Sequence, residues 1–107
     1  MRERDVERKF VEAVRRAGGV AYKFLSTTAN GLPDRLVLFP QGRAAFVELK
    51  APGRKPRPLQ VKRAEQLRAL GFPVFCIDRM EQIASVITEI LNRTHERKVA
   101  PNEVHTA

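Results

Sequence analysis

The chain contains no tryptophan, one tyrosine, one cysteine and two histidines among its 107 residues. It also lacks an apolar run of the roughly 18 residues that a membrane-spanning helix needs, and its first residues lack the apolar segment of a signal peptide. The lone cysteine, Cys76, excludes an intrachain disulfide, and its apolar neighbours predict a buried structural thiol. We therefore expect an intracellular, cytoplasmic protein with no room for a second domain.

Zinc binding and nucleophilic catalysis have little support in the sequence. His95 and His105 both lie in the polar segment 92–107, which shows no hydrophobic periodicity and predicts a flexible tail outside a domain of residues 1–91. Ser26 and the two threonines after it have no adjacent base that could activate a hydroxyl. The candidates for chemistry are therefore acids and lysines.

Positive charge is concentrated in one half of the chain. The net charge is +8, and residues 1–60 hold 13 Lys and Arg against 6 Asp and Glu, whereas residues 61–107 hold 7 against 6. Between Lys50 and Arg63 there are six basic residues and no acid. A solvated loop is one reading, but this concentration favours a surface that binds a polyanion such as nucleic acid. A membrane surface is disfavoured, because prolines at 52, 56 and 58 prevent an amphipathic helix there.

The hydrophobic pattern predicts an α/β fold with the order α-β-β-β-α-β-α. Helical spacing predicts helices at 6–17, 59–70 and 80–91, and glycines follow the first two. Apolar, β-compatible runs predict strands at 20–25, 35–39, 44–50 and 72–77, and a turn at 40–43 joins two of them into a hairpin. The last strand follows a helical crossover and can lie parallel to the strand before it. We expect a mixed four-stranded sheet flanked by helices.

Two acids and a lysine belong to the predicted hairpin. Asp34 opens one strand and Glu48 lies near the end of its partner, 14 positions later, so the two carboxylates can converge at one edge of the sheet. Glu48 and Lys50 share a face, and the backbone carbonyl of Leu49 lies between them. Oxygen ligands of this kind suit Mg²⁺, and Lys50 could orient or deprotonate a water. The alternative is an exposed charged pair on an edge strand.

Two further side chains face inward near helix starts. Glu7 lies within the apolar stripe of the first predicted helix, where a carboxylate needs a partner, either a metal ion or the helix N-terminus itself. Gln60 faces inward at the start of the second helix, where it could bond a metal-bound water or a phosphate, or cap the helix. Candidate phosphate contacts are the basic residues Lys23, Arg35, Arg54, Lys55, Arg57 and Lys62.

The set of Glu7, the run Gly31-Leu32-Pro33-Asp34, the run Glu48-Leu49-Lys50 and Gln60 resembles, in order and spacing, the virus-type replication-repair nuclease (VRR-NUC) family of the PD-(D/E)XK nuclease superfamily. The runs 46–53 and 58–60 are also similar to that family. The likeness extends from about Val6 to Ile90, which is nearly the whole chain. It implies a PD-(D/E)XK nuclease-like fold.

The resemblance also implies a metal site formed by Asp34, Glu48 and the Leu49 carbonyl. The ion would be Mg²⁺, with Mn²⁺ as its substitute. Glu7 would complete this site or hold a second ion, Lys50 would be catalytic, and Gln60 would support them. Free-standing members of phages and bacteria are similar to archaeal resolvases that cleave four-way (Holliday) junctions as homodimers. On this reading the chain is a structure-selective DNA endonuclease of DNA repair that needs no small-molecule cofactor.

Other functions remain open at this point. A flap or end-processing nuclease would use the same residues, and a non-catalytic DNA-binding module could retain the fold without metal binding. A sequence-specific restriction enzyme is a further alternative, although 107 residues leave little room for base-reading elements.

Overall fold

The computed structural model of the chain describes residues 2–24 and 30–93. Its elements are α1 (Glu3–Arg16), β1 (Val20–Lys23), β2 (Arg35–Phe39), β3 (Arg43–Leu49), α2 (Pro58–Ala69), β4 (Val74–Ile77) and α3 (Glu81–Leu91). This is the predicted order, with boundaries that differ by up to three residues. The predicted tail beyond residue 93 and the loop residues 25–29 lie outside the described residues.

The four strands form one sheet in the order β1-β2-β3-β4. β1 and β2 are antiparallel, and so are β2 and β3, whereas β3 and β4 are parallel. The mixed sheet and the parallel crossover through α2 are therefore confirmed. In the hairpin, Arg35 pairs with Val47 and Phe39 pairs with Arg43.

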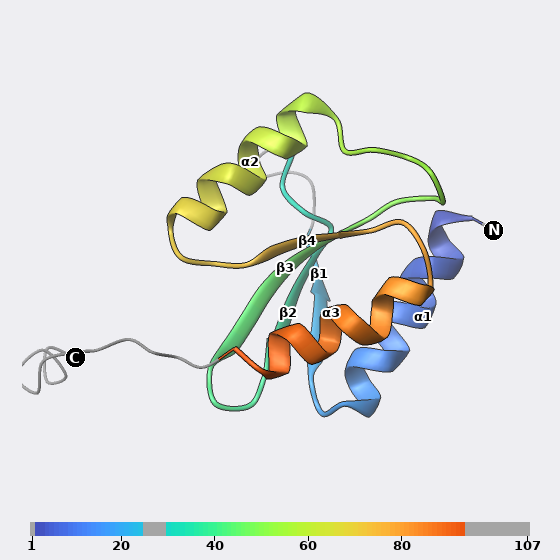
Figure 1. Cartoon of the computed structure of the whole chain (residues 1–107), viewed down its shortest axis with the longest axis vertical. Helices are drawn as coiled ribbons and strands as arrows, with labels where there is room; N and C mark the ends of the chain where they lie inside the picture. Colours follow the sequence, from blue (N-terminus) through green and yellow to red (C-terminus); the bar gives the residue numbers. More distant parts are fainter. Residues whose placement is uncertain (1, 25–29, 94–107) are drawn as a thin grey trace, which may run out of the picture.

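Helices α1 and α3 cover one face of the sheet and form the core with it (Figure 1). α1 contributes Val6, Phe10 and Val14, which are fully buried and follow one another at intervals of four residues, as one face of a helix requires. The strands contribute alternate residues to the same core, and α3 contributes its own apolar stripe. The stripe of α3 consists of Ile83, Val86, Ile87 and Ile90.

The start of α1 lies earlier than predicted because polar residues form its first turn. The backbone amide of Arg2 donates a hydrogen bond to Oδ2 of Asp5 over 3.0 Å, and Glu3 and Asp5 place negative charge at the helix N-terminus. Hydrophobic periodicity alone does not detect a first turn that consists of polar residues. It marks only Val6 as the first buried position.

Helix α2 lies on the other side of the sheet, next to β4 (Figure 1). None of its 12 residues, all of which are described, is buried. It is attached by polar contacts, among them a hydrogen bond of 2.8 Å from Nη2 of Arg68 to the Val74 carbonyl. α2 therefore covers the β3–β4 end of this face and does not extend over its β1–β2 end. Cys76 of β4 is exposed on this side, so the predicted burial of its thiol is wrong.

In the described part of the chain, every helix is too short to cross a bilayer.

Candidate active site

Asp34 and Glu48 meet where the hairpin strands β2 and β3 come together. Asp34 directly precedes β2, and the pairing of Arg35 with Val47 places it beside Glu48. The backbone amide of Asp34 donates a hydrogen bond to Oε1 of Glu48 over 3.1 Å, and the amide of Leu49 donates to Oδ2 of Asp34 over 2.8 Å. Each strand thus fixes the carboxylate carried by the other.

Lys50 completes a compact charged group. Its Nζ lies 3.3 Å from Oε2 of Glu48, and the two side chains are only 14% and 6% exposed. The amide of Lys50 donates to the carbonyl of Ile77 over 2.9 Å, which extends the pairing of β3 with β4 by one residue. The ammonium group is therefore attached to the rigid sheet, although Lys50 itself follows the last residue of β3.

The surroundings of Glu48 favour its protonated form. Burial raises the pKa of the Glu48 carboxyl, the hydrogen bond and negative charge of Asp34 raise it further, and Lys50 lowers it in part, with a result of about 7. A carboxyl with this pKa carries a proton in about half of the molecules near neutral pH. A cation placed between the two acids would relieve the desolvation and repulsion that cause the shift.

Gln60 connects this group to α2. Its Oε1 accepts a hydrogen bond of 2.8 Å from the amide of Arg57, which caps the helix, while its Nε2 donates to Oε2 of Glu48. The sequence left two alternatives open for Gln60, helix capping and a contact at the site. In the structure its side-chain oxygen caps the helix, and its side-chain nitrogen contacts Glu48. Gln60 therefore sets the position of the helix relative to the Glu48 carboxylate.

Glu7 has a protein partner on the α1 side of the sheet. Its Oε2 lies 3.3 Å from Nε of Arg35, and Nη1 of Arg35 donates to the carbonyl of Ala21 over 3.0 Å. Glu7 and Arg35 also line an open groove of about 460 Å³ along α1. Arg35 thus joins α1, β1 and β2 at the residue next to Asp34.

Arg63 is a residue that the sequence analysis did not select. Its Nε donates to the carbonyl of Asn30 over 2.9 Å, so it ties α2 to the segment before Asp34. Gly31 in that segment has a φ of +81°, and a Cβ there would lie 2.8 Å from Cγ of Leu59. Glycine is needed at this position because α2 approaches the backbone closely. In the sequence, Arg63 lies one helical turn after Gln60, and this spacing indicates that the two residues share a face of α2.

The space beside the acids is small. A cavity of about 90 Å³ separates α2 from β4, with Glu48, Gln60 and Cys76 in its lining next to apolar residues such as Val61 and Val74. It has room for a few water molecules but not for a nucleotide.

The predicted phosphate contacts occupy two sides of the molecule. Arg54, Lys55 and Arg57 are exposed between β3 and α2, and Lys62 is exposed on α2. Lys23 is exposed at the end of β1. Arg35, by contrast, is largely buried, with its guanidinium group bound to Glu7 and to the Ala21 carbonyl.

The donor groups at the hairpin fit a magnesium ion. Mg²⁺ commonly binds one or two carboxylates and retains several water molecules. Asp34 and Glu48 supply two carboxylates, and the Leu49 carbonyl belongs to the same strand end. Within residues 2–24 and 30–93, no cluster of three or more His, Cys, Asp or Glu residues forms a larger metal site. The fit therefore depends on two carboxylates with backbone and water oxygens.

Comparison with known proteins adds two matches. No family model matches the chain. The chain is 43% identical over 90 residues to "Putative nuclease p44" of Acyrthosiphon pisum secondary endosymbiont phage 1, covering 84% of this chain and 96% of that protein. It also resembles a solved structure titled "VRR_NUC domain", with a TM-score of 0.74 and 32% identity, covering 80% of this chain and 94% of that chain. Both alignments span nearly the whole of the related proteins.

Proposed function

Because this chain belongs to the VRR-NUC family of nucleases, we propose that it is a Mg²⁺-dependent, structure-selective DNA endonuclease that nicks four-way (Holliday) junctions as a homodimer. The observation that carries the proposal is the group formed by Asp34, Glu48 and Lys50, in which two carboxylates and an ammonium group meet at one end of a hairpin. Metal-assisted hydrolysis of a phosphodiester bond can use such groups, the carboxylates to hold a cation and the ammonium group to act on a water.

The acids would hold the ion and the lysine would act on the water. Asp34, Glu48 and the Leu49 carbonyl are the proposed ligands. Glu7 pairs with Arg35 and, among the described residues, joins no cluster of three acids with them, so it is proposed as a ligand of a second ion. When bound, Mg²⁺ polarises the scissile phosphate and raises the fraction of coordinated water present as hydroxide. Lys50 orients or helps to deprotonate the attacking water, or offsets the charge that develops on the phosphorus oxygens. Gln60 holds Glu48 in place through its amide group.

The distribution of charge supports DNA as the substrate. Exposed Arg54, Lys55 and Arg57 come a few residues after Lys50 and after β3, the strand that carries Glu48, so a phosphate backbone bound there would run past the two acids. Such contacts position a nucleic acid without reading its sequence. We propose a role in DNA repair in the cytoplasm of a bacterial cell, encoded by the host or by a phage. The similar phage protein supports this setting.

A cleavage panel tests the proposal. The full chain would be incubated with four-way junction, flap and linear duplex DNA in MgCl₂, in MnCl₂ and in EDTA. We expect nicking of the four-way junction with either metal and none in EDTA. Preferential cleavage of the flap would instead support a flap or end-processing nuclease, and binding without cleavage would support a non-catalytic module.

Two substitutions test the residues. Glu48→Ala and Lys50→Ala should each abolish cleavage and leave DNA binding largely intact, because the phosphate contacts are elsewhere. Glu65→Ala is the matched control, since Glu65 is an exposed acid on α2. Retained cleavage in both site variants would contradict the assignment.

A further inference from the structure

Helix α2 contacts the chain on both sides of the Asp34–Glu48 pair. Its Gln60 donates a hydrogen bond to Oε2 of Glu48, on β3. Its Arg63 donates through Nε to the carbonyl of Asn30 over 2.9 Å, in the segment that leads to Asp34. Figure 1 shows this segment beginning beside α2 and running down into β2. One helix therefore bridges the two strands that carry the acids.

The contact at Arg63 is close as well as polar. A Cβ on Gly31 would lie 3.1 Å from Cγ of Arg63, and φ at Gly31 is +81°. The segment after Gly31 is stiff, because Pro33 fixes its own φ and restricts Leu32 to extended conformations. Pro33 is also buried. The position of Gly31 beneath α2 is therefore transmitted to Asp34, which follows Pro33 directly.

The start of α2 depends on such polar contacts. No residue of this helix is buried, and the cavity of about 90 Å³ beneath it has Glu48 and Gln60 in its lining, so the helix has room to shift there. A further polar tether, from Nη2 of Arg68 to the Val74 carbonyl, belongs to the other end of the helix. Arg68 lies about 12 Å along the axis from Gln60, whereas Arg63 lies only about 4.5 Å from it. Arg63 is therefore well placed to fix the position of Gln60.

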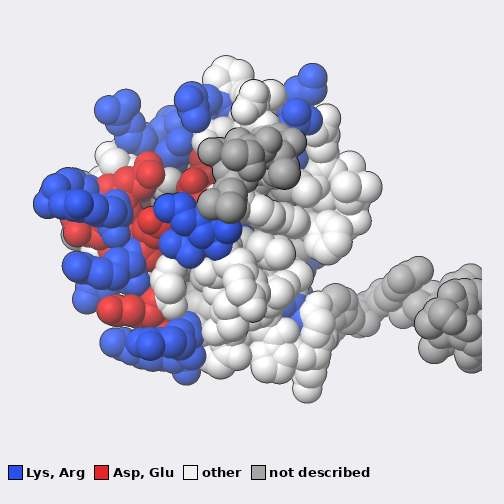
Figure 2. Space-filling view, turned by 180° about the vertical axis from the view of Figure 1, so that it is seen from behind, with Lys and Arg blue, Asp and Glu red and all other residues white. Residues whose placement is uncertain are grey.

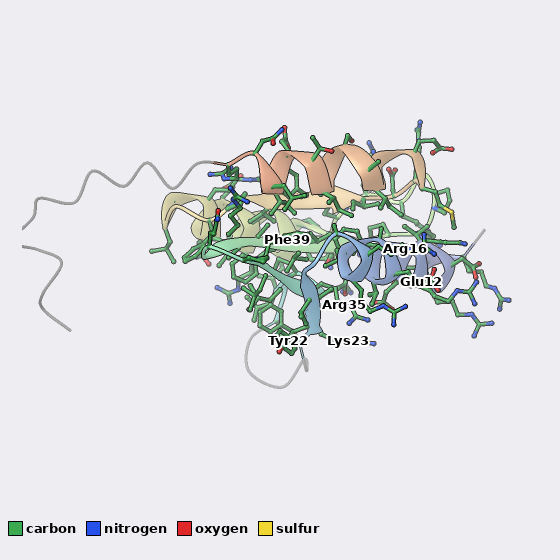
Figure 3. All side chains as sticks on the ribbon, turned by 90° about the horizontal axis from the view of Figure 1, so that it is seen from below. Glu12, Arg16, Tyr22, Lys23, Arg35 and Phe39 are labelled. Carbon is green, nitrogen blue, oxygen red and sulfur yellow. The ribbon has the colours of Figure 1, made fainter. Side chains whose placement is uncertain are left out.

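Arg63 acts as a hydrogen-bond donor rather than as a paired charge. Charged side chains gather toward one side of the molecule, where Lys and Arg lie beside Asp and Glu (Figure 2). Arg16 and Glu12, which Figure 3 labels on α1, form one such pair. The two acceptors of Arg63 are neutral instead, namely the Asn30 carbonyl and, 3.0 Å from Nη1, Oε1 of Gln66. The tether to Asn30 therefore needs a donor at the position of Nε and no positive charge.

We propose that Arg63 is a positioning residue of the metal site, an inference that rests on the proposed function for the presence of the metal. Through the segment 30–33 it holds the start of α2 next to Asp34, which keeps the Gln60 amide on Glu48. The Glu48 carboxylate is then oriented from both sides, by the Asp34 amide at Oε1 and by Gln60 at Oε2. Groups that orient ligands in this way commonly contribute a factor of about 10 to 100 to metal affinity.

Three substitutions separate the donor of Arg63 from its charge and its packing. Arg63→Gln keeps an N–H donor at the position of Nε, because both side chains carry a nitrogen on Cδ, but it removes the positive charge. Arg63→Met removes donor and charge and keeps the apolar stem beside Gly31. Arg68→Met is the matched control, since it removes a bond of 2.8 Å from α2 to a backbone carbonyl away from Asp34. Arginine, glutamine and methionine have similar helix propensities, so the helix itself is not weakened.

Titration calorimetry of the full chain with Mn²⁺ measures the effect on the metal site. We expect Arg63→Met to raise the dissociation constant for Mn²⁺ by about 10-fold or more, and Arg63→Gln and Arg68→Met to leave it within about threefold of the unchanged chain. In cleavage assays, Arg63→Met should need correspondingly more Mg²⁺ for its half-maximal rate and should recover most of the rate at saturating Mg²⁺. A role in folding alone would lower the folded fraction without changing the dissociation constant.

A second measurement needs neither metal nor DNA. In a ¹⁵N-labelled chain in EDTA, the side-chain amide protons of Gln60 report its bond to Glu48 through slow exchange with solvent. Gln60→Glu identifies these resonances by removing them. We expect exchange to become about 10-fold faster in Arg63→Met, because the start of α2 opens more often, and to stay unchanged in Arg63→Gln and Arg68→Met.

The other outcomes separate this inference from the proposed function. Equal Mn²⁺ affinities in Arg63→Met and the unchanged chain, or equal losses in Arg63→Met and Arg68→Met, would overturn the inference and leave the proposed nuclease intact. If Arg63→Gln and Arg63→Met both lost affinity for a four-way junction in EDTA, Arg63 would be a phosphate contact and the inference would be wrong. Absence of Mn²⁺ binding in the unchanged chain would contradict the proposed function, and the exchange rates of Gln60 would still decide whether Arg63 positions α2.

Discussion

Asp34 and Glu48 hold each other in place through the backbone of the hairpin. The amide of Asp34 donates to Oε1 of Glu48 over 3.1 Å, and the amide next to Glu48, that of Leu49, donates to Oδ2 of Asp34 over 2.8 Å. The separation of the two carboxylates is therefore set by the register of β2 and β3 rather than by a loop. Register is rigid because a slip of one residue would exchange the buried and exposed faces of both strands.

Removing the charge of one acid should remove the metal. We expect Asp34→Asn to abolish Mn²⁺ binding measured by titration calorimetry, because the amide oxygen of asparagine can still accept from Leu49 but supplies no negative charge to the ion. The fold should persist for the same reason. Glu65→Gln, on the exposed side of α2, is the control and should bind Mn²⁺ normally. Undiminished binding by Asp34→Asn would place the ion elsewhere.

The pKa of Glu48 predicts how stability changes with pH in the absence of metal. Burial and Asp34 raise this pKa from 4.5 to about 7, so the folded state binds a proton that the unfolded state has released between these values. The contribution of Glu48 to stability is therefore fully present below pH 4.5 and is lost as the pH rises through 7.

Chemical denaturation at pH 5 and pH 8 in EDTA would measure this loss. The shift corresponds to at most about 3 kcal/mol. Glu48→Gln keeps the shape of the side chain without the titration, so it should flatten the pH dependence and stabilise the protein at pH 8. An unchanged pH dependence in Glu48→Gln would show that other groups cause it.

The local pattern of the sequence was sufficient to predict the positions of the helices and strands and the proximity of Asp34 and Glu48. The apolar spacing of α1 and α3 identified the helices because each buries one stripe against the sheet. The convergence of Asp34 and Glu48 could be predicted because a short hairpin fixes which residues are opposite each other. Both inferences use only contacts between residues that are close in sequence or paired in a ladder.

Contacts between distant elements could not be predicted. The pairing of Glu7 with Arg35 depends on how α1 crosses the sheet, and no spacing in the sequence encodes that crossing. α2 was expected to have an inward face, but it lies against the end of the sheet and buries none of its described residues. The exposure of Cys76 follows from the same placement, because a helix centred on the sheet would have covered it.

The Glu7–Arg35 pair should contribute to stability as a structural link. The two side chains are 23% and 15% exposed, and Arg35 also bonds the Ala21 carbonyl, so Arg35→Ala would leave a carboxylate and a carbonyl without their donor. We expect a loss of about 1 to 3 kcal/mol in urea denaturation. Arg8→Ala is the control. Nη2 of Arg8 lies 3.9 Å from Oδ1 of Asp5 and the Arg8 side chain is 69% exposed, so this substitution should cost less than about 0.5 kcal/mol of stability. Equal losses of stability in Arg35→Ala and Arg8→Ala would show that the Glu7–Arg35 pair has no structural role.

The segment between β3 and α2 should supply most of the electrostatic attraction for DNA. Each phosphate neutralised by a protein cation contributes about 0.9 to the slope of log affinity against log salt concentration. Replacing Arg54, Lys55 and Arg57 with alanine should therefore reduce that slope by about 3, measured by fluorescence anisotropy with a labelled four-way junction in EDTA.

A second triple variant separates local contacts from net charge. Arg15, Arg16 and Arg79 are exposed residues of α1 and of the turn before α3, and replacing them with alanine removes the same total charge. This variant should change the slope by less than 1, because counterion release depends on cations that touch phosphates rather than on the charge of the whole chain. Equal slopes in the two variants would mean that DNA does not follow the segment beside the acids, and the direction proposed for its path past Glu48 and Lys50 would be wrong.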